Sequence, residues 1–204
     1  KCLIEQLVKE CLELSEDCTS YKQWYSVAEK KAKIDTLAMQ YEIETDTTEI
    51  NRLFKDYILT EYGKLSSNID ADTPVLVSRA MEYMRDHSKR FVIIVMDGMS
   101  EFDWRVISRS FNDIKYEKAS AFAMIPTVTS ISRQCLLSNK YPLQLVNPWG
   151  QSKEKSEFTA CAKDLGYADT QISYQRGYDS DFGSLIKCGA VIINDVDDMV
   201  HGQK

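Results

Sequence analysis

The sequence predicts an α/β fold, with a mostly parallel sheet that has helices on both faces and is preceded by an all-helical segment. Over residues 1–88, apolar side chains recur at the spacing of amphipathic helices. From Phe91 onward, short apolar runs alternate with amphipathic segments, a pattern typical of parallel strands connected by helices. We therefore divide the chain into a helical segment, 1–88, and an α/β part, 89–204.

The helical segment is expected to contain several helices. In its first 40 residues the apolar positions are Leu3, Leu7, Cys11, Trp24, Val27, Ala28, Ile34, Leu37 and Ala38. A further helix is expected to begin at a capping residue within 46–48 and to end at Gly63. Residues 64–72 are polar and indicate a linker. Pro74 suits the first turn of a last helix that continues to about Asp86.

The α/β part is expected to alternate between strands and helices. The predicted strands are 91–96, roughly 116–124, 170–174 and 190–194, and the predicted helices are 101–111, 129–137, 153–165 and 179–186. Ligands of parallel sheets bind beyond the carboxyl ends of the strands. Asp97, the segment 126–130 and Asp195 all lie at such ends, so they are the first candidates for a functional site.

Composition excludes several classes of protein. A chain of 204 residues with 44% hydrophobic residues can bury a core, so disorder is not expected. The net charge of -6 and the pI near 5.1 lack the basic excess of a dedicated nucleic-acid binder, although a local basic patch is compatible with a nucleic-acid substrate. No apolar run approaches the roughly 18 residues of a membrane span, and the amino-terminal residues are too charged for a secretory signal. We expect a cytoplasmic protein without a membrane partner.

The cysteines suggest no function. None forms a C-x-x-C pair or has histidine partners at zinc-finger spacing, so we expect reduced and mostly buried thiols. They are Cys2, Cys11, Cys18, Cys135, Cys161 and Cys188.

The first candidate motif is the apolar run FVIIVM followed by Asp97 and Gly98. An isolated Asp-Gly is a common turn. A carboxylate directly after a buried strand, however, is held rigidly, and a divalent cation would offset the cost of holding it there. Met99 stands where a haloacid-dehalogenase-type site needs a second Asp. The chain also lacks the G-x-x-x-x-G-K-[ST], G-x-G-x-x-G and G-x-S-x-G motifs, so NTP loops, dinucleotide binding and elbow-type serine hydrolysis are not expected.

The second motif is PTVTSISR, residues 126–133. One interpretation is that Thr129 or Ser130 simply caps the following helix. The other is that the helix amino terminus binds phosphate through its free N–H groups and its dipole. Arg133 would lie on the same helical face as Thr129, where its guanidinium can bind a phosphate oxygen. A hydroxyl at this position becomes a nucleophile once a metal or a base removes its proton.

The third motif lies in AVIINDVDDMVHGQ, near the end of the chain. Asp197 and His201 are four residues apart, so both side chains can bind one metal ion from a single helical turn. A lone D-x-x-x-H is a weak signal on its own. The other histidine, His87, lies in the polar stretch DHSKR, where solvent exposure is expected.

Together, the three motifs resemble those of the alkaline phosphatase superfamily, and more closely the PglZ domain within it. The resemblance covers about Arg90 to Gln203 and consists of the strand ending in Asp-Gly, the P-T-x-T-S-x-S-R turn and the strand leading to D-D-x-x-H-G-Q. It implies an alkaline phosphatase-like fold and a metal-dependent phosphatase or phosphodiesterase. The substrate would be a phosphate ester, and a nucleotide or nucleic acid is a candidate. The helical segment does not contribute to the resemblance.

The resemblance also implies roles for individual residues. Superfamily members use two divalent ions, usually zinc, and a metal-bound Ser or Thr that is transiently phosphorylated. Asp97 would hold the second ion and Thr129 would be the nucleophile, with Ser130 as the fallback. Asp197 and His201 would hold the first ion, with Asp198 as an alternative to Asp197.

The sequence departs from the superfamily pattern in one respect. The Asp-His pair for the second ion and a further histidine for the first ion are missing, so we expect this chain to be the amino-terminal part of a longer enzyme and to be inactive alone. The alternative is a non-catalytic PglZ-like interaction module of a phage-defence or signalling complex, with residues 1–88 recruiting protein partners. The sequence does not distinguish a monoester substrate from a diester.

Overall fold

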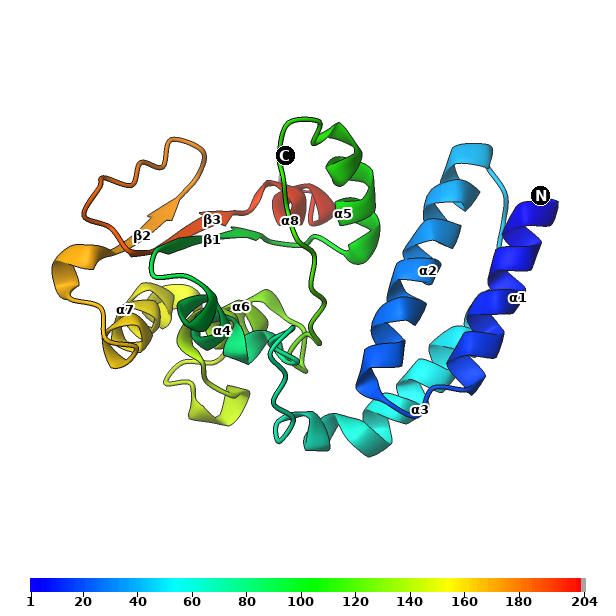
Figure 1. The fold of residues 1–204 in the computed structure, drawn as a ribbon, viewed down its shortest axis with the longest axis horizontal. Helices are drawn as coiled ribbons and strands as arrows, with labels where there is room; N and C mark the ends of the chain where they lie inside the picture. The colour runs from blue at the N-terminus through cyan, green and yellow to red at the C-terminus, as the bar shows by residue number, and fades with distance from the viewer. Residues whose placement is uncertain (203–204) are drawn as a thin grey trace. The chain divides into compact units, whose positions relative to one another are not determined.

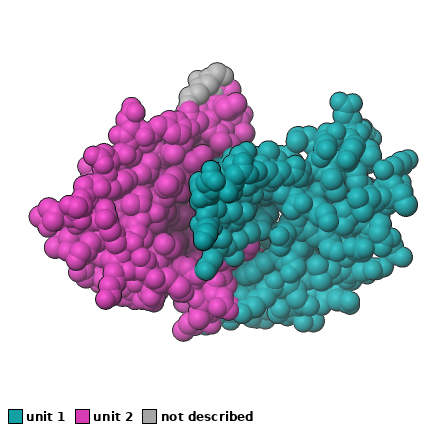
Figure 2. Space-filling view, turned by 45° about the horizontal axis from the view of Figure 1, so that its top comes forward, with its two compact units in different colours: residues 1–68, 99–118 teal, residues 69–98, 119–204 magenta. Residues whose placement is uncertain are grey.

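A computed structural model describes residues 1–202, which form two compact units. Unit 1 contains residues 1–68 and 99–118, and unit 2 contains residues 69–98 together with the chain from 119 onward (Figure 2). The structure is α/β, as predicted, with a small open sheet of three parallel strands (Figure 1). None of the helices in the described residues has both the length and the apolar character that a membrane span requires.

Unit 1 is helical. It contains α1 (Cys2–Glu16), α2 (Tyr21–Tyr41), α3 (Thr48–Leu65), α5 (Glu101–Ile107) and the short 3-10 helix η2 (Ser108–Ser110). The helices predicted in the first 40 residues are confirmed, and Leu7 and Cys11 are buried on one face of α1. Two of the predicted apolar positions, Leu3 and Ala28, are exposed, and Ile4 rather than Leu3 lies on the buried face of α1. In α2 the Trp24 ring packs against Phe54 and Tyr57 of α3, with ring centroids 5.1 Å and 5.4 Å apart.

Unit 2 contains the sheet, whose strand order is β1-β3-β2. The strands are β1 (Phe91–Met96), β2 (Ile172–Arg176) and β3 (Cys188–Ile193), and both pairings are parallel. All six residues of the central strand β3 are buried, which explains its uninterrupted run of small and apolar residues. Because the strands are parallel, their carboxyl ends meet at one edge of the sheet, where Met96 pairs with Ile193.

Three helices of unit 2 pack on one face of this sheet: α4 (Ala80–His87), α6 (Thr129–Ser138) and α7 (Glu154–Asp164) (Figure 1). The shared core consists of Met81, Phe91, Leu137, Phe158, Cys161, Ala162, Cys188, Ala190 and Ile192. On the opposite face the Phe182 ring lies over Gly189, where an added Cβ would come within 2.6 Å of the ring. Near Gly189 that face is therefore covered by irregular chain, whereas helices were predicted on both faces of the sheet.

The remaining elements of unit 2 are short. They are the 3-10 helices η1 (Val77–Arg79), η3 (Pro142–Gln144), η4 (Gln151–Lys153) and η5 (Asp169–Gln171), and the final helix α8 (Asp195–Val200). The helix expected after Pro74 therefore begins later, as η1 and then α4. Helix α3 continues to Leu65, two residues beyond the predicted end at Gly63.

Two predicted elements of the α/β part are absent from the structure. The expected strand over 116–124 is reduced to a single bridge between Leu76 and Phe122, and most of this Ala- and Ser-containing segment lacks the β-branched residues that favour strands. The expected helix over 179–186 is irregular chain. The Gln175 side chain accepts a hydrogen bond from the Asp181 main-chain N–H (2.9 Å), and this contact favours a turn over a helix.

The cysteines match the prediction of free, mostly buried thiols. Cys11, Cys135, Cys161 and Cys188 are buried, Cys18 is half-buried and Cys2 is exposed. Burial raises the pKa of Cys161 and of Cys188 to about 12, which makes their thiolates rare at neutral pH.

Candidate functional site at the carboxyl edge of the sheet

Asp97 lies directly after β1, at the carboxyl edge of the sheet. Its main-chain N–H donates to the Ile193 carbonyl (3.0 Å), which extends the β1–β3 pairing by one residue. The following residue, Gly98, has φ +79°, and its N–H donates to Asp97 Oδ1 (3.0 Å). An added Cβ on Gly98 would lie 3.0 Å from the Asp197 nitrogen. Both the positive φ and this close approach require glycine here, and the turn brings the first and third motifs together.

The third motif forms the helix α8 and the residue that follows it. Asp197 Oδ1 lies 3.4 Å from His201 Nε2, so the predicted four-residue spacing does bring the carboxylate and the imidazole together. The contact is made by Asp197, the first of the two aspartates that the sequence left open as metal ligands. Gln203, the last residue of the motif, lies outside the described residues.

The threonine-rich turn precedes α6, and its Ile125–Pro126 peptide is cis. Helix α6 begins at Thr129, and Val128 occupies the N-cap position. The Val128 carbonyl accepts hydrogen bonds from the N–H groups of Ile131 (3.0 Å) and Ser132 (2.9 Å). The interpretation of Thr129 or Ser130 as the capping residue is therefore wrong, since no side chain caps this helix. Thr129 is a half-buried residue, and its hydroxyl does not cap the helix.

Arg133 lies one turn after Thr129 in α6, and its side chain is only 2% exposed. Nη1 donates to Asp97 Oδ2 (2.6 Å) and to Asn194 Oδ1 (2.9 Å), and Nη2 donates to Gln151 Oε1 (2.8 Å). The guanidinium thus connects α6 to the carboxyl ends of β1 and β3. In this arrangement it neutralises Asp97, whereas the sequence predicted that it would bind a phosphate oxygen.

A second buried carboxylate, Glu154, completes the environment of Arg133. Its side chain is 0% exposed, and its Oε2 accepts from Arg133 Nε (2.6 Å). Its Oε1 accepts from the Tyr174 hydroxyl and, at 3.3 Å, from Arg176 Nη2. We call this set the Arg133 network; its members are Asp97, Arg133, Gln151, Glu154, Tyr174, Arg176 and Asn194. Every charged member has an oppositely charged partner, as buried ions require.

Sequence reasoning missed Glu154, Tyr174 and Arg176, although two signals for them exist. Glu154 lies four residues before Phe158, on the buried stripe of α7, so a carboxylate on that stripe should have indicated a buried ion pair. Tyr174 and Arg176 alternate with Gln175 at the end of β2, which places the first two on one face of the strand. Either pattern would have directed attention to the β2 end of the sheet.

At this edge of the sheet, burial raises the pKa values of Asp97 and Tyr174. Burial raises the pKa of the Asp97 carboxyl, and the Asp197 charge raises it further, while the Arg133 charge and the Gly98 N–H act in the opposite direction. Burial and the adjacent Glu154 raise the pKa of Tyr174 to about 12. Tyr174 is therefore a neutral hydroxyl that donates to Glu154 at physiological pH.

The donor types at this edge fit a divalent metal, since carboxylates and an imidazole are the ligands that zinc accepts. Asp197 contacts His201 and lies close enough to Asp97 to affect its titration. Within residues 1–202, however, no three side chains of His, Cys, Asp or Glu are grouped as a metal site. His87 is exposed, as predicted, and its ring stacks on Tyr83 with centroids 4.0 Å apart.

Comparison with known proteins adds no family assignment. No protein-family model matches the chain, and no curated protein sequence matches it. The resemblance to PglZ domains therefore rests on the three sequence motifs.

Proposed function

We propose that this chain belongs to a cytoplasmic, metal-dependent phosphatase or phosphodiesterase of the PglZ type, with Thr129 as the nucleophile. The main supporting observation is the position of Thr129 at the start of α6, in a helix that Val128 caps. One turn later, Arg133 connects the same helix to Asp97 at the end of β1. Asp197 and His201 lie beside that strand end, because Asp197 packs on Gly98.

In the proposed reaction, the Thr129 oxygen bonds to phosphorus as the bond to the leaving alcohol breaks. The Thr129 proton passes to solvent, and the departing alkoxide takes up a proton. Water then attacks the phosphorylated threonine and restores the hydroxyl, which releases phosphate if the substrate was a monoester and a phosphomonoester if it was a diester. Divalent cations held by Asp97 and by the Asp197–His201 pair would supply the Lewis acidity that lowers the pKa of the hydroxyl. The free N–H groups of the first turn of α6 would stabilise negative charge on the phosphate oxygens.

The test is turnover of 4-nitrophenyl phosphate and bis(4-nitrophenyl) phosphate by the purified full-length protein in the presence of zinc. Replacing a nucleophile removes most of the rate enhancement, so Thr129→Ala should lower kcat by at least about 100-fold. Thr127→Ala is the matched control in the same turn, and its kcat should stay near the wild-type value. A Thr129→Ala variant that keeps full activity would contradict the proposal, and a loss in Ser130→Ala instead would move the role to the fallback residue.

The alternative proposal is a non-catalytic PglZ-like interaction module. The observation that favours it is the ion pair between Arg133 and Asp97, which occupies one oxygen of the carboxylate that the metal would need. A folded full-length protein that binds no zinc and hydrolyses neither ester would support this alternative over the enzyme.

A further inference from the structure

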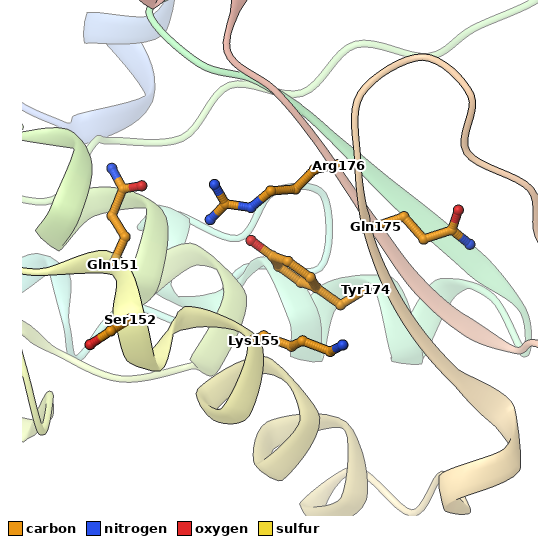
Figure 3. A pocket seen from close by; sticks show the side chains of 6 residues that line it. All are labelled: Gln151, Ser152, Lys155, Tyr174, Gln175 and Arg176. Carbon is orange, nitrogen blue, oxygen red and sulfur yellow. The ribbon is translucent and has the colours of Figure 1, made fainter.

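A pocket of about 380 Å³ lies at the carboxyl end of β2. Two segments of unit 2 line it, the start of α7 with the preceding η4 and the last residues of β2 (Figure 3). We call it the basic pocket; its lining residues are Gln151, Ser152, Lys155, Tyr174, Gln175 and Arg176. Its volume falls in the range of small-molecule sites, which is roughly 300–1,000 Å³.

The lining residues include two cations and no carboxylate. Lys155 is exposed and forms no ion pair with any residue in 1–202. Glu154, which precedes Lys155 in the chain, is fully buried and already binds Arg133, Tyr174 and Arg176. Glu154 therefore cannot compensate the Lys155 charge, and an anion in the pocket would.

Polar groups converge in this pocket from both segments. Figure 3 shows the Arg176 guanidinium and the Tyr174 hydroxyl extending from β2 toward Gln151, while the Gln175 side chain and the Lys155 ammonium point away from them. Gln175 is engaged elsewhere, since it accepts from the Asp181 main-chain N–H (2.9 Å). The Arg176 side chain is 48% exposed, its contact with Glu154 is long, at 3.3 Å, and it also contacts Tyr174. A guanidinium has five N–H groups, so those that these two residues do not engage can bind a ligand.

The basic pocket adjoins the candidate site through three members of the Arg133 network, Gln151, Tyr174 and Arg176. Gln151 lines the pocket, and its Oε1 accepts from the same Arg133 guanidinium that binds Asp97. Both places lie at the carboxyl edge of one parallel sheet, where a single ligand can contact several strand ends. A substrate whose reacting phosphate lies near Thr129 can therefore extend toward Lys155 and Arg176.

We propose that the basic pocket binds a second phosphate of the substrate, one that is not attacked. The substrate class is then phosphate esters with at least two phosphate groups, such as short oligonucleotides, rather than simple monoesters. The Arg176 guanidinium binds the phosphate oxygens, the exposed Lys155 side chain rotates toward them on binding, and the remaining volume accommodates the attached sugar. This inference rests on the proposed function for the reaction, but binding in the pocket can be measured without turnover.

The test compares two probes, thymidine dinucleotide with and without a terminal phosphate, by titration calorimetry on the full-length protein at fixed ionic strength. The terminally phosphorylated probe should bind more tightly. Loss of one charge-assisted contact should weaken its binding about five- to ten-fold in Lys155→Gln. Lys153→Gln is the matched control, because Lys153 is an exposed lysine of η4 that does not line the pocket and the substitution removes the same charge. Its dissociation constant should change by less than about two-fold.

Two results would overturn the inference: equal affinity for both probes, or equal weakening in Lys155→Gln and Lys153→Gln. Because Lys155 has no ion-pair partner to lose, Lys155→Gln should fold normally, which a thermal melt checks. Failure of the proposed function is distinguishable. If Thr129→Ala retains turnover while Lys155→Gln loses affinity for the second phosphate, the pocket inference stands and the nucleophile assignment fails.

Discussion

Arg52 in unit 1 and Arg133 in unit 2 each lie between two carboxylates. In α3 of unit 1, Arg52 binds Glu49 and Asp56 at 2.6 Å each. In α6 of unit 2, Arg133 binds Asp97 and Glu154, also at 2.6 Å. The distances are the same and the surroundings differ, because the Arg52 side chain is 54% exposed and the Arg133 side chain is 2% exposed.

The difference in burial changes what each arginine does. The partners of Arg52 are three and four residues away in the same helix, so its contacts reinforce only local structure and are screened by water. The partners of Arg133 are 36 and 21 residues away, on different elements. Removing one member of a buried set leaves an uncompensated charge in a region of low dielectric constant. The Arg133 network therefore fixes the positions of β1, α6 and α7 at the candidate site.

The largest expected effect is that of Arg133→Met. This change leaves Asp97 and Glu154 without their shared cation, so the free energy of unfolding should fall by about 3–5 kcal/mol. Urea denaturation followed by circular dichroism measures it.

A double-mutant cycle with Glu154→Gln serves as the control for this prediction. Contacting residues of one network are coupled, so the two losses should differ from additivity by about 1–3 kcal/mol. If Arg133→Met lowered the free energy of unfolding by less than about 1 kcal/mol, the buried ion pairs of Arg133 would contribute no more to stability than exposed ones such as those of Arg52.

A smaller effect is expected for Tyr174→Phe. The variant loses the hydroxyl that donates to Glu154, so its free energy of unfolding at neutral pH should fall by about 1–2 kcal/mol. The pKa of Tyr174 in the folded protein is about 12, above its ordinary value of 10.0. Its contribution to stability is therefore complete below pH 10 and is lost as the pH rises toward 12.

The measurement for Tyr174→Phe is a series of urea titrations between neutral and alkaline pH. The difference between wild type and variant should be constant below pH 10 and should shrink above it. Cys161 and Cys188 titrate in both proteins and so cancel in the comparison. A difference that grows with alkaline pH would contradict this interpretation.

Local sequence patterns predicted the elements that local physics determines. The apolar run of β1, the helix after the threonine-rich turn and the buried strand β3 were all found near their predicted positions. The approach of Asp197 to His201 was also predictable, because it depends only on helical spacing. The expected strand over 116–124 and the helix over 179–186 failed because neither has a strong periodic pattern.

The Arg133 network could not be predicted in full, because its members are distant in the sequence. The helical spacing predicted that Arg133 lies on the same face as Thr129, and we therefore expected its guanidinium to bind a phosphate. Only the packing of α6 against α7 places Glu154 at 2.6 Å from Arg133 Nε and so gives the guanidinium a protein partner. Pairings of this kind depend on tertiary contacts and not on local propensity.

The smallest effect on stability is expected at Arg52. It tests whether exposed ion pairs contribute less than the buried ion pairs of Arg133. Arg52→Gln removes contacts with Glu49 and Asp56 that have the same length as those of Arg133. Because all three side chains are about half exposed, water replaces the lost contacts and the denaturation midpoint should not change measurably. Raising the salt concentration should likewise leave the wild-type and Arg52→Gln midpoints together. A midpoint shift comparable to that of Arg133→Met would mean that contact distance, rather than burial, determines the contribution of these ion pairs.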